Sequence, residues 1–164
     1  MESLSSADQS FLASAQDFWC TLTINYPHAS GHVSGTINVT GSVSCPVTMT
    51  EMFLQVHLQK STGASWAGPS KDLFNTTWLN TNAATSCSSG AGSYRGRAYT
   101  EVRPPAGWSP AMQSQTKYSP YVSVACGGGT GFAAAGDTDG EVELLPDGSL
   151  SVSWPIQFVK DSSS

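Results

Sequence analysis

Apolar residues recur at every second position in several separate stretches of this chain. The run FWCTLTINY carries them at Phe18, Cys20, Leu22, Ile24 and Tyr26. Residues 33 to 45 and 51 to 60 repeat the pattern, with polar side chains at most of the positions between. This alternation is typical of strands that bury one face and leave the other in water. It therefore predicts an antiparallel, all-β protein.

Turn signals divide the rest of the chain. Residues 61 to 91 are rich in Ser, Thr, Gly, Ala and Asn, which predicts a long connection with one or two short edge strands. SYRGRAYTEV and YVSVAC are predicted strands, with a turn-rich crossing over 103 to 117. The turn Pro146-Asp147-Gly148 stands between two alternating stretches and predicts a β-hairpin. That hairpin can complete the same sheet or pair with the sheet edge of a neighbouring chain.

Both ends of the chain are predicted to be extensions of a central domain over residues 18 to 126. Residues 1 to 17 contain a capping-box pattern, which predicts a short N-terminal helix. Phe11 and Leu12 fall on its apolar face, so we expect this helix to dock on the domain or on another chain. Residues 127 to 164 hold a glycine-rich spacer and the predicted hairpin.

The surface is expected to be rich in hydroxyls and amides, because only 12% of the 164 residues are charged, against a norm of about 25%. A chain of this length suits one domain. The net charge is -5 and the basic residues gather only at Arg95, Arg97 and Arg103, so we expect no nucleic-acid partner. No run approaches the roughly 18 apolar residues of a membrane span, so we expect no membrane insertion.

The four cysteines, Cys20, Cys45, Cys87 and Cys126, form an even set without any C-x-x-C pair. This spacing disfavours a zinc ribbon or a thioredoxin-type site. Two disulfides are the preferred interpretation, and four buried free thiols in a cytosolic protein are the alternative. Because disulfides persist in oxidising compartments, we expect an extracellular protein.

No motif brings together the groups that catalysis or a metal site needs. His28 and His32 lie in a turn and lack a helical metal-ligand spacing, and the G-x-S-x-G nucleophile elbow is absent. Asp137, Asp139 and Glu141 could supply oxygen ligands to calcium, but the full EF-hand spacing is missing, and an outward acidic edge explains these residues as well. The sequence therefore predicts no enzyme and no cofactor, with calcium at these three carboxylates as the one metal candidate.

Three tryptophans, Trp66, Trp78 and Trp108, fall in predicted loops. Exposed loop aromatics suit a protein hot spot or a sugar ring, whereas buried ones would close the ends of the sheets. With Phe11 and Leu12 they are the candidate partner contacts. The first expectation is a non-enzymatic extracellular module that binds a protein or forms part of a larger secreted assembly. A carbohydrate-binding module that uses the three tryptophans is the alternative, and a small hydrolase comes third.

Several runs of the chain share features with a known group of proteins. CTLTINYPHASGHVSGTINVTGSVSC, SYRGRAYTEVRPPAGWSPA and YVSVAC resemble a diffuse group of small secreted actinobacterial proteins of unknown function, over residues 18 to 126. The resemblance implies secretion and a β-sandwich with the disulfides Cys20–Cys45 and Cys87–Cys126, one of three formally possible pairings. The predicted fold class is therefore an immunoglobulin-like antiparallel β-sandwich with two disulfides, a short N-terminal helix and a C-terminal β-hairpin.

Reduction of the two disulfides should destabilise the protein measurably. Loops of the sizes that this pairing closes imply about 3 to 4 kcal/mol per bridge in the chain-entropy model, against about 5 to 15 kcal/mol for a whole domain. Urea unfolding with and without reductant measures the loss. Four alkylatable sulfhydryls in native protein, detected by intact mass, would contradict the disulfide interpretation.

Overall fold

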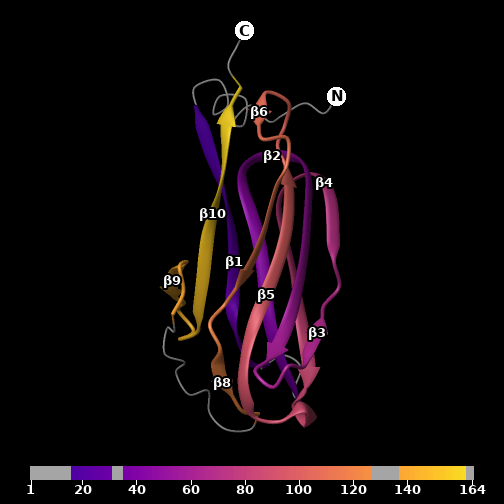
Figure 1. Ribbon diagram of the computed structural model, residues 1–164, viewed down its shortest axis with the longest axis vertical. Helices are drawn as coiled ribbons and strands as arrows, with labels where there is room; N and C mark the ends of the chain where they lie inside the picture. The colour runs from indigo at the N-terminus through magenta and orange to yellow at the C-terminus, as the bar shows by residue number, and fades with distance from the viewer. Residues whose placement is uncertain (1–15, 31–34, 127–136, 162–164) are drawn as a thin grey trace.

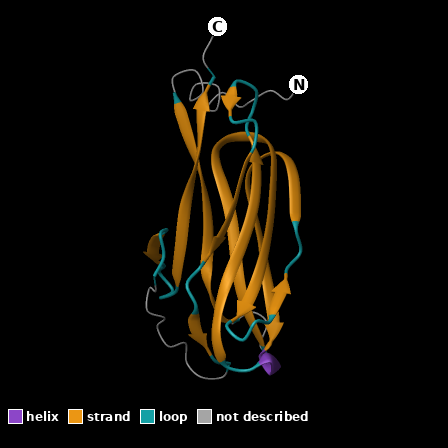
Figure 2. Cartoon of the chain, viewed as in Figure 1, coloured by secondary structure: helices purple, strands orange, loops and turns teal. Residues whose placement is uncertain are grey.

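A computed structural model describes residues 16–30, 35–126 and 137–161 of the chain. The described residues form almost entirely β-strands (Figures 1 and 2), joined in one ten-stranded sheet whose pairings are all antiparallel. The strands are β1 (Asp17–Ala29), β2 (Thr36–Lys60), β3 (Ser65–Ala67), β4 (Lys71–Ser86), β5 (Gly92–Arg103), β6 (Trp108–Ser109), β7 (Gln113–Tyr118), β8 (Val122–Val124), β9 (Glu141–Leu144) and β10 (Leu150–Lys160). A single 3-10 turn, η1 (Cys87–Ser89), precedes β5. The prediction of an antiparallel, all-β protein is confirmed.

Strand β2 belongs to both halves of the sheet. Its part before Ser44 pairs with β1 and with the second half of β4, whereas residues 51–60 pair with β5. Between Ser44 and Met49 the register with β4 shifts, and β2 arches over at the top of Figure 1. After Met49 the buried positions change from odd to even numbers, because an extra residue reverses the side-chain alternation. The sheet is therefore folded over on itself, with its two halves face to face.

The C-terminal hairpin completes the sheet of its own chain. Strand β10 pairs with β1 from Asp17 opposite Val159 to Asn25 opposite Ser151. Strand β9 then pairs with the start of β10, as the Pro146-Asp147-Gly148 turn predicts. Of the two pairings left open by the sequence, the structure therefore shows the one within the chain.

The core lies between the two halves and consists of the alternating apolar residues. The fully buried members of the predicted sets are Phe18, Cys20, Leu22, Ile24, Ile37, Val39, Val43, Met52, Leu54, Val56 and Leu58. Val33, which the pattern also places inward, lies outside the described residues. Since full burial of one such aliphatic side chain contributes about 1.5 to 3 kcal/mol, this shared core is what holds the halves together.

Both disulfides have the pairing that the resemblance implies. Cys20 and Cys45 join β1 to β2 with a Cα–Cα distance of 4.2 Å, one position beyond the paired residues Thr21 and Ser44. Cys87 and Cys126 join η1 to the segment after β8 with a Cα–Cα distance of 5.9 Å. No cysteine is free. Two such bridges indicate folding in an oxidising environment.

The prediction of a long connection over residues 61 to 91 is wrong. This segment forms β3 and the 16-residue strand β4, which pairs with β2 along most of its length. The inward side chains in the second half of β4 are Leu79, Thr81, Ala83 and Thr85, so the apolar alternation is missing. The hydroxyl of Thr81 donates to the Pro69 carbonyl at 2.7 Å, which satisfies this polar group in the interior.

Other predictions concern segments at the limits of the described residues. The crossing over 103 to 117 also forms strands, since it contains β6 and most of β7. The predicted helix falls outside the described residues, together with Phe11 and Leu12, and β1 already begins at Asp17. Among the described residues, no helix has the length and apolar character needed to cross a membrane.

We expect Gly96→Ala to destabilise the protein by about 1 to 3 kcal/mol, as overpacking of a core does. A Cβ at this position of β5 would lie 2.6 Å from Val39 Cγ2 and 2.8 Å from Ile24 Cγ2, on the opposite half of the sheet. Urea unfolding measures the change. The double variant Gly96→Ala/Val39→Ala should lose less than the sum of the two single variants, because Val39→Ala removes a clashing methyl group. Strict additivity would contradict this close contact between the halves.

Candidate functional site

The three candidate tryptophans do not lie on one surface. Trp108 of β6 is buried and packs edge-on against Phe18 with ring centroids 4.8 Å apart, which fits the alternative that this ring closes an end of the sheets. Trp66 of β3 is half-buried and lies 6.2 Å from the Tyr94 ring. Of the three, only Trp78, on β4, is among the exposed side chains, at 52%. Because β6 and β3 lie toward opposite ends of the molecule (Figure 1), one sugar chain would not stack on all three rings.

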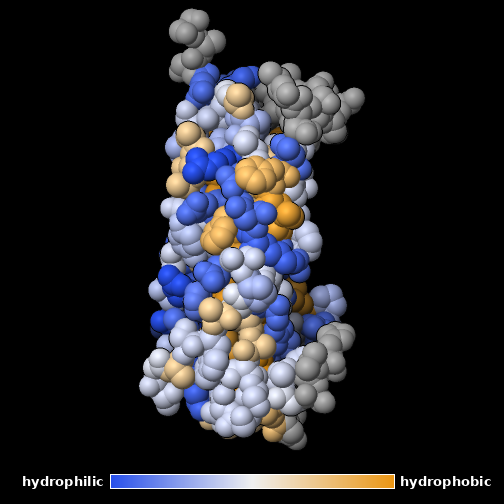
Figure 3. All heavy atoms as spheres, turned by 90° about the vertical axis from the view of Figure 1, so that its right-hand side faces the viewer, coloured by the Kyte–Doolittle hydropathy of each residue, from blue (hydrophilic) through white to orange (hydrophobic). Residues whose placement is uncertain are grey.

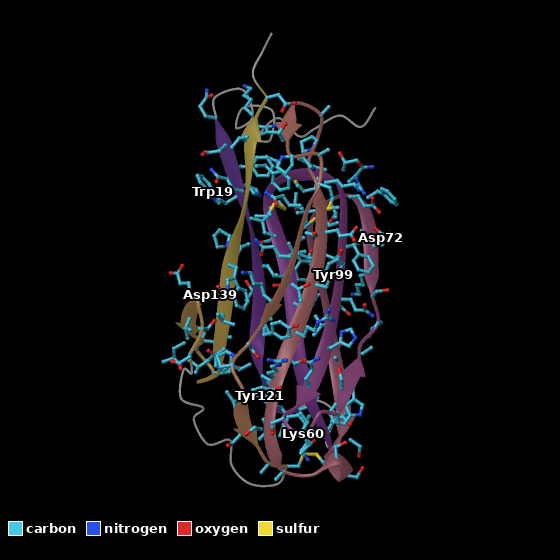
Figure 4. All side chains as sticks on the ribbon, in the orientation of Figure 1. Trp19, Lys60, Asp72, Tyr99, Tyr121 and Asp139 are labelled. Atoms are coloured by element: carbon cyan, nitrogen blue, oxygen red, sulfur yellow. A yellow bond between two sulfur atoms is a disulfide. The ribbon has the colours of Figure 1, made fainter. Side chains whose placement is uncertain are left out.

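A groove of about 510 Å³ opens between β7 and β10. Its walls come from Arg95 of β5, residues 116–121, residues 137–139 and Trp154 of β10. We call it the tyrosine groove, after Tyr118 and Tyr121 within the 116–121 wall. Figure 4 labels Tyr121 and Asp139, which come from its two different walls.

Arg95 is held in place on one wall of the tyrosine groove by two rings and an amide. Its guanidinium carbon lies 4.2 Å from the centre of the Tyr118 ring and 4.8 Å from that of Tyr121. Its Nε donates a hydrogen bond of 2.9 Å to Gln59 Oε1. Cation–π contacts of this kind fix both the guanidinium and the rings. One wall of the groove is therefore preorganised.

The opposite wall is built on Asp139. Trp154 Nε1 donates a hydrogen bond of 2.8 Å to Asp139 Oδ1, and Lys117 Nζ lies 3.8 Å from Asp139 Oδ2. The Trp154 hydrogen bond, and after it the Lys117 charge, lower the pKa of Asp139. Gly140 allows this approach, because a Cβ there would lie 2.7 Å from Trp154 Cε2. Asp139 is thus an ionised carboxylate fixed at the groove.

The calcium candidates do not form a cluster. In residues 16–30, 35–126 and 137–161, no three side chains of His, Cys, Asp or Glu come together as metal ligands would. Asp139 is engaged by Trp154, and Glu141 lies on the exposed side of β9. Asp137 lines the tyrosine groove. The interpretation of an outward acidic edge fits Glu141 better than a calcium site does.

A second surface consists of apolar side chains on β4. Leu73, Phe74 and Trp78 are 49%, 63% and 52% exposed, and we call them the β4 edge patch. Figure 3 views this side of the molecule, with apolar side chains gathered on its upper half. Strand β4 pairs only with β2 in the described sheet, so its other side is an edge. An exposed edge with large apolar side chains is a typical site of pairing with another chain.

Carboxylates flank the β4 edge patch. Glu51 stands opposite Phe74 in the β2–β4 register, and its neighbour is Asp72 of β4. A hydrogen bond between the two carboxyl groups raises the pKa of Glu51, with burial and the Asp72 charge acting in the same direction. Arg103 Nε lies 3.4 Å from Glu51 Oε1. The positive charge of Arg103 lowers the pKa of Glu51 and offsets the rise only in part. The patch therefore has an acidic border.

The described histidines form no catalytic arrangement with a second candidate group. His57 stands opposite Arg97 in the β2–β5 register, and the two side chains lie 3.4 Å apart. Burial, and then the Arg97 charge, lower the pKa of His57. His28 Nδ1 lies 3.1 Å from the Tyr26 carbonyl oxygen. His57 is therefore in contact with a basic side chain across the strands.

Comparison with protein-family models, with curated proteins and with solved structures finds no match to this chain. The resemblance to small secreted actinobacterial proteins therefore stays a prediction. What the fold and the two surfaces define is an antiparallel, all-β, disulfide-bonded protein with two candidate binding surfaces.

Glu51→Gln should raise the melting temperature at pH 7. A carboxyl with a raised folded-state pKa makes its full contribution to stability at pH values below its unfolded pKa of about 4.3. That contribution is lost as the pH rises through the higher folded-state value, so at pH 7 the ionised Glu51 faces Asp72 unfavourably. The gain in the variant should disappear near pH 4. Thermal scans at both pH values measure it, with Glu141→Gln on β9 as the control, and an equal gain at both pH values would contradict this account.

Proposed function

We propose that this chain is a non-enzymatic extracellular interaction module that docks another protein at the β4 edge patch, within a larger secreted assembly. The observation that carries the proposal is the exposure of Leu73, Phe74 and Trp78 within six positions of an edge strand. Other exposed large apolar side chains of the described residues are spread over different strands, such as Trp19 on β1, Leu144 on β9 and Val159 on β10, whereas β4 carries three of them. Large exposed apolar patches rimmed by polar residues mark interaction sites.

The partner we propose is an extended segment of another protein, with apolar side chains next to Lys or Arg. A segment of this kind can add a strand to the free edge of β4, with main-chain hydrogen bonds giving affinity. The acidic border favours a positively charged partner segment, because a basic side chain beside Glu51 and Asp72 would relieve the repulsion between these two carboxylates. A second copy of this chain would bring the same carboxylates and a net charge of -5, which opposes self-association.

The extracellular setting is supported by the two disulfides, which persist where the environment is oxidising. The proposal includes an immunoglobulin-like sandwich, supported by the face-to-face halves of the folded sheet. The Cys20–Cys45 bridge differs from the bridge between sheets in antibody domains, since β1 and β2 are adjacent strands of one half.

The other two functions have less support. Saccharide binding is favoured by the tyrosine groove and not by the three tryptophans, of which Trp108 is buried. A small hydrolase would need a nucleophile, a base and an orienting group within hydrogen-bond reach. The side chain of His57 contacts Arg97. An arginine can serve neither as the nucleophile that a general base activates nor as the carboxylate that orients the base.

Phe74→Ser should weaken the binding of selected peptides. Panning of displayed random peptides against the intact protein is expected to enrich sequences that alternate apolar residues with Lys or Arg. Since an aromatic hot spot contributes about 2 kcal/mol or more, and a tenfold change in affinity corresponds to about 1.4 kcal/mol, the variant should bind such a peptide at least about thirtyfold more weakly by isothermal titration. Leu144→Ser is the matched control, because Leu144 is an exposed apolar residue on β9.

Four results would count against this proposal. Enrichment of acidic peptides, or binding that is indifferent to Phe74→Ser, would remove the β4 edge patch as the docking surface. Failure to enrich any peptide would argue against recognition of an extended segment. A dimer in mass photometry that Phe74→Ser dissociates would show that a second copy occupies the edge.

A further inference from the structure

We infer that the tyrosine groove binds an acidic saccharide, through a sugar carboxylate that pairs with Arg95. This site goes beyond protein docking, because its lining residues belong to β5, β7, β10 and the segments beside them. The β4 edge patch contributes none of them. The two proposals can therefore fail independently.

The tyrosine groove has the size and rigidity of a small-molecule site. Its volume of about 510 Å³ falls within the roughly 300 to 1,000 Å³ of typical ligand pockets. One wall is fixed by the contacts of Arg95 with two rings, and the other by the Trp154 to Asp139 hydrogen bond. A preformed site loses little conformational entropy when a ligand binds.

Arg95 provides the anion contact. Its Nε is taken by Gln59, but a guanidinium has five N–H donors in a planar fork. In the part of the chain that the structure describes, no carboxylate lies within ion-pair distance of Arg95, and the ion pairs there involve Arg103 and Lys117. A half-buried guanidinium of this kind matches the two oxygens of a carboxylate.

The remaining lining suits the ring and hydroxyls of a sugar. Tyr118 and Tyr121 are 40% and 44% exposed, so each ring keeps accessible surface beside the guanidinium. Aromatic rings provide apolar contact to the C–H face of a sugar. Thr116 and Thr138 bring hydroxyls, and Asp137 brings a carboxylate that can accept from sugar hydroxyls. The lining of the groove thus offers a stacking surface, hydrogen-bond donors and hydrogen-bond acceptors.

The charge balance favours one carboxylate over a phosphate group or a polyanion. Asp137 and Asp139 line the same groove as Arg95 and Lys117. The low pKa of Asp139 keeps its carboxylate ionised. A ligand with two negative charges at one group would meet repulsion there, whereas a single carboxylate can be held by Arg95 while the sugar hydroxyls face the carboxylates.

The test uses intact protein and a panel of oligosaccharides of glucuronate, galacturonate and sialic acid, each paired with its methyl ester. Isothermal titration should show at least one acidic member binding about tenfold or more tightly than its ester, as a charge-assisted hydrogen bond predicts. In Arg95→Gln this difference between acid and ester should disappear. Tyr121→Ala should weaken acid and ester alike. Arg103→Gln, on the same strand but paired with Glu51, should change neither.

Each alternative result has a defined meaning. If no acidic member binds more tightly than its ester, or if Arg95→Gln preserves the difference, the inference is wrong. Preference for sulfated or neutral sugars would contradict recognition of a carboxylate by Arg95. Preference for peptides with a free C-terminal carboxylate would contradict a saccharide as the ligand. Phe74→Ser should leave saccharide affinity unchanged, so loss of docking at β4 and loss of this site are distinguishable.

Discussion

The change of register within β2 decides where the other strands lie. Between Ser44 and Met49 the strand leaves one half of the sheet and enters the other, and the same continuous strand then pairs with β5. Val47 and Met49 are fully buried in this arch, so apolar packing holds the reversal. The Cys20–Cys45 bridge ties the start of the arch to β1. Apolar burial and one covalent link together keep the halves face to face, which every surface feature depends on.

The tyrosine groove exists because the folded sheet is not closed by backbone pairing between β7 and β10. Side-chain amides bridge this gap instead: Gln113 Nε2 donates to the Gln157 carbonyl at 2.8 Å, and Gln115 Nε2 donates to the Pro155 carbonyl at 3.1 Å. Such contacts cover an edge without extending the ladder. Beyond them the strands diverge enough to leave a groove, and Asp139 and Trp154 form its far wall.

The β4 edge patch arises at the other margin of the folded sheet, where β4 crosses between the halves. This edge is irregular, because Asn75 adopts a φ of 56° and distorts the strand next to Phe74. Short or irregular edges limit uncontrolled pairing between copies of a protein. The acidic border also disfavours pairing between two copies, because Glu51 and Asp72 of one copy would lie close to the same carboxylates of the other. Together they restrict the edge to a partner of complementary charge.

Local patterns in the sequence were sufficient for several strands and much of the core, but not for β4, β6 and β7 or for either surface. Alternation at Leu22 and Leu54 predicts which side chains are buried, because the two faces of a strand differ in their access to water. The same rule fails for β4, where Thr81 and Ala83 face inward and only a tertiary hydrogen bond explains the buried hydroxyl.

The sequence by itself determined the all-β class, the inward faces of most strands and the presence of cysteines in an even set. Only the tertiary structure brought Arg95 beside Tyr118 and Tyr121, since these rings lie 23 and 26 positions further along the chain and only the β5–β7 and β5–β8 pairings bring them back to Arg95. It also buried Trp108 and exposed Phe74. The reason is physical: burial along one strand follows from local alternation, whereas contacts between strands depend on register and on how the whole sheet folds over.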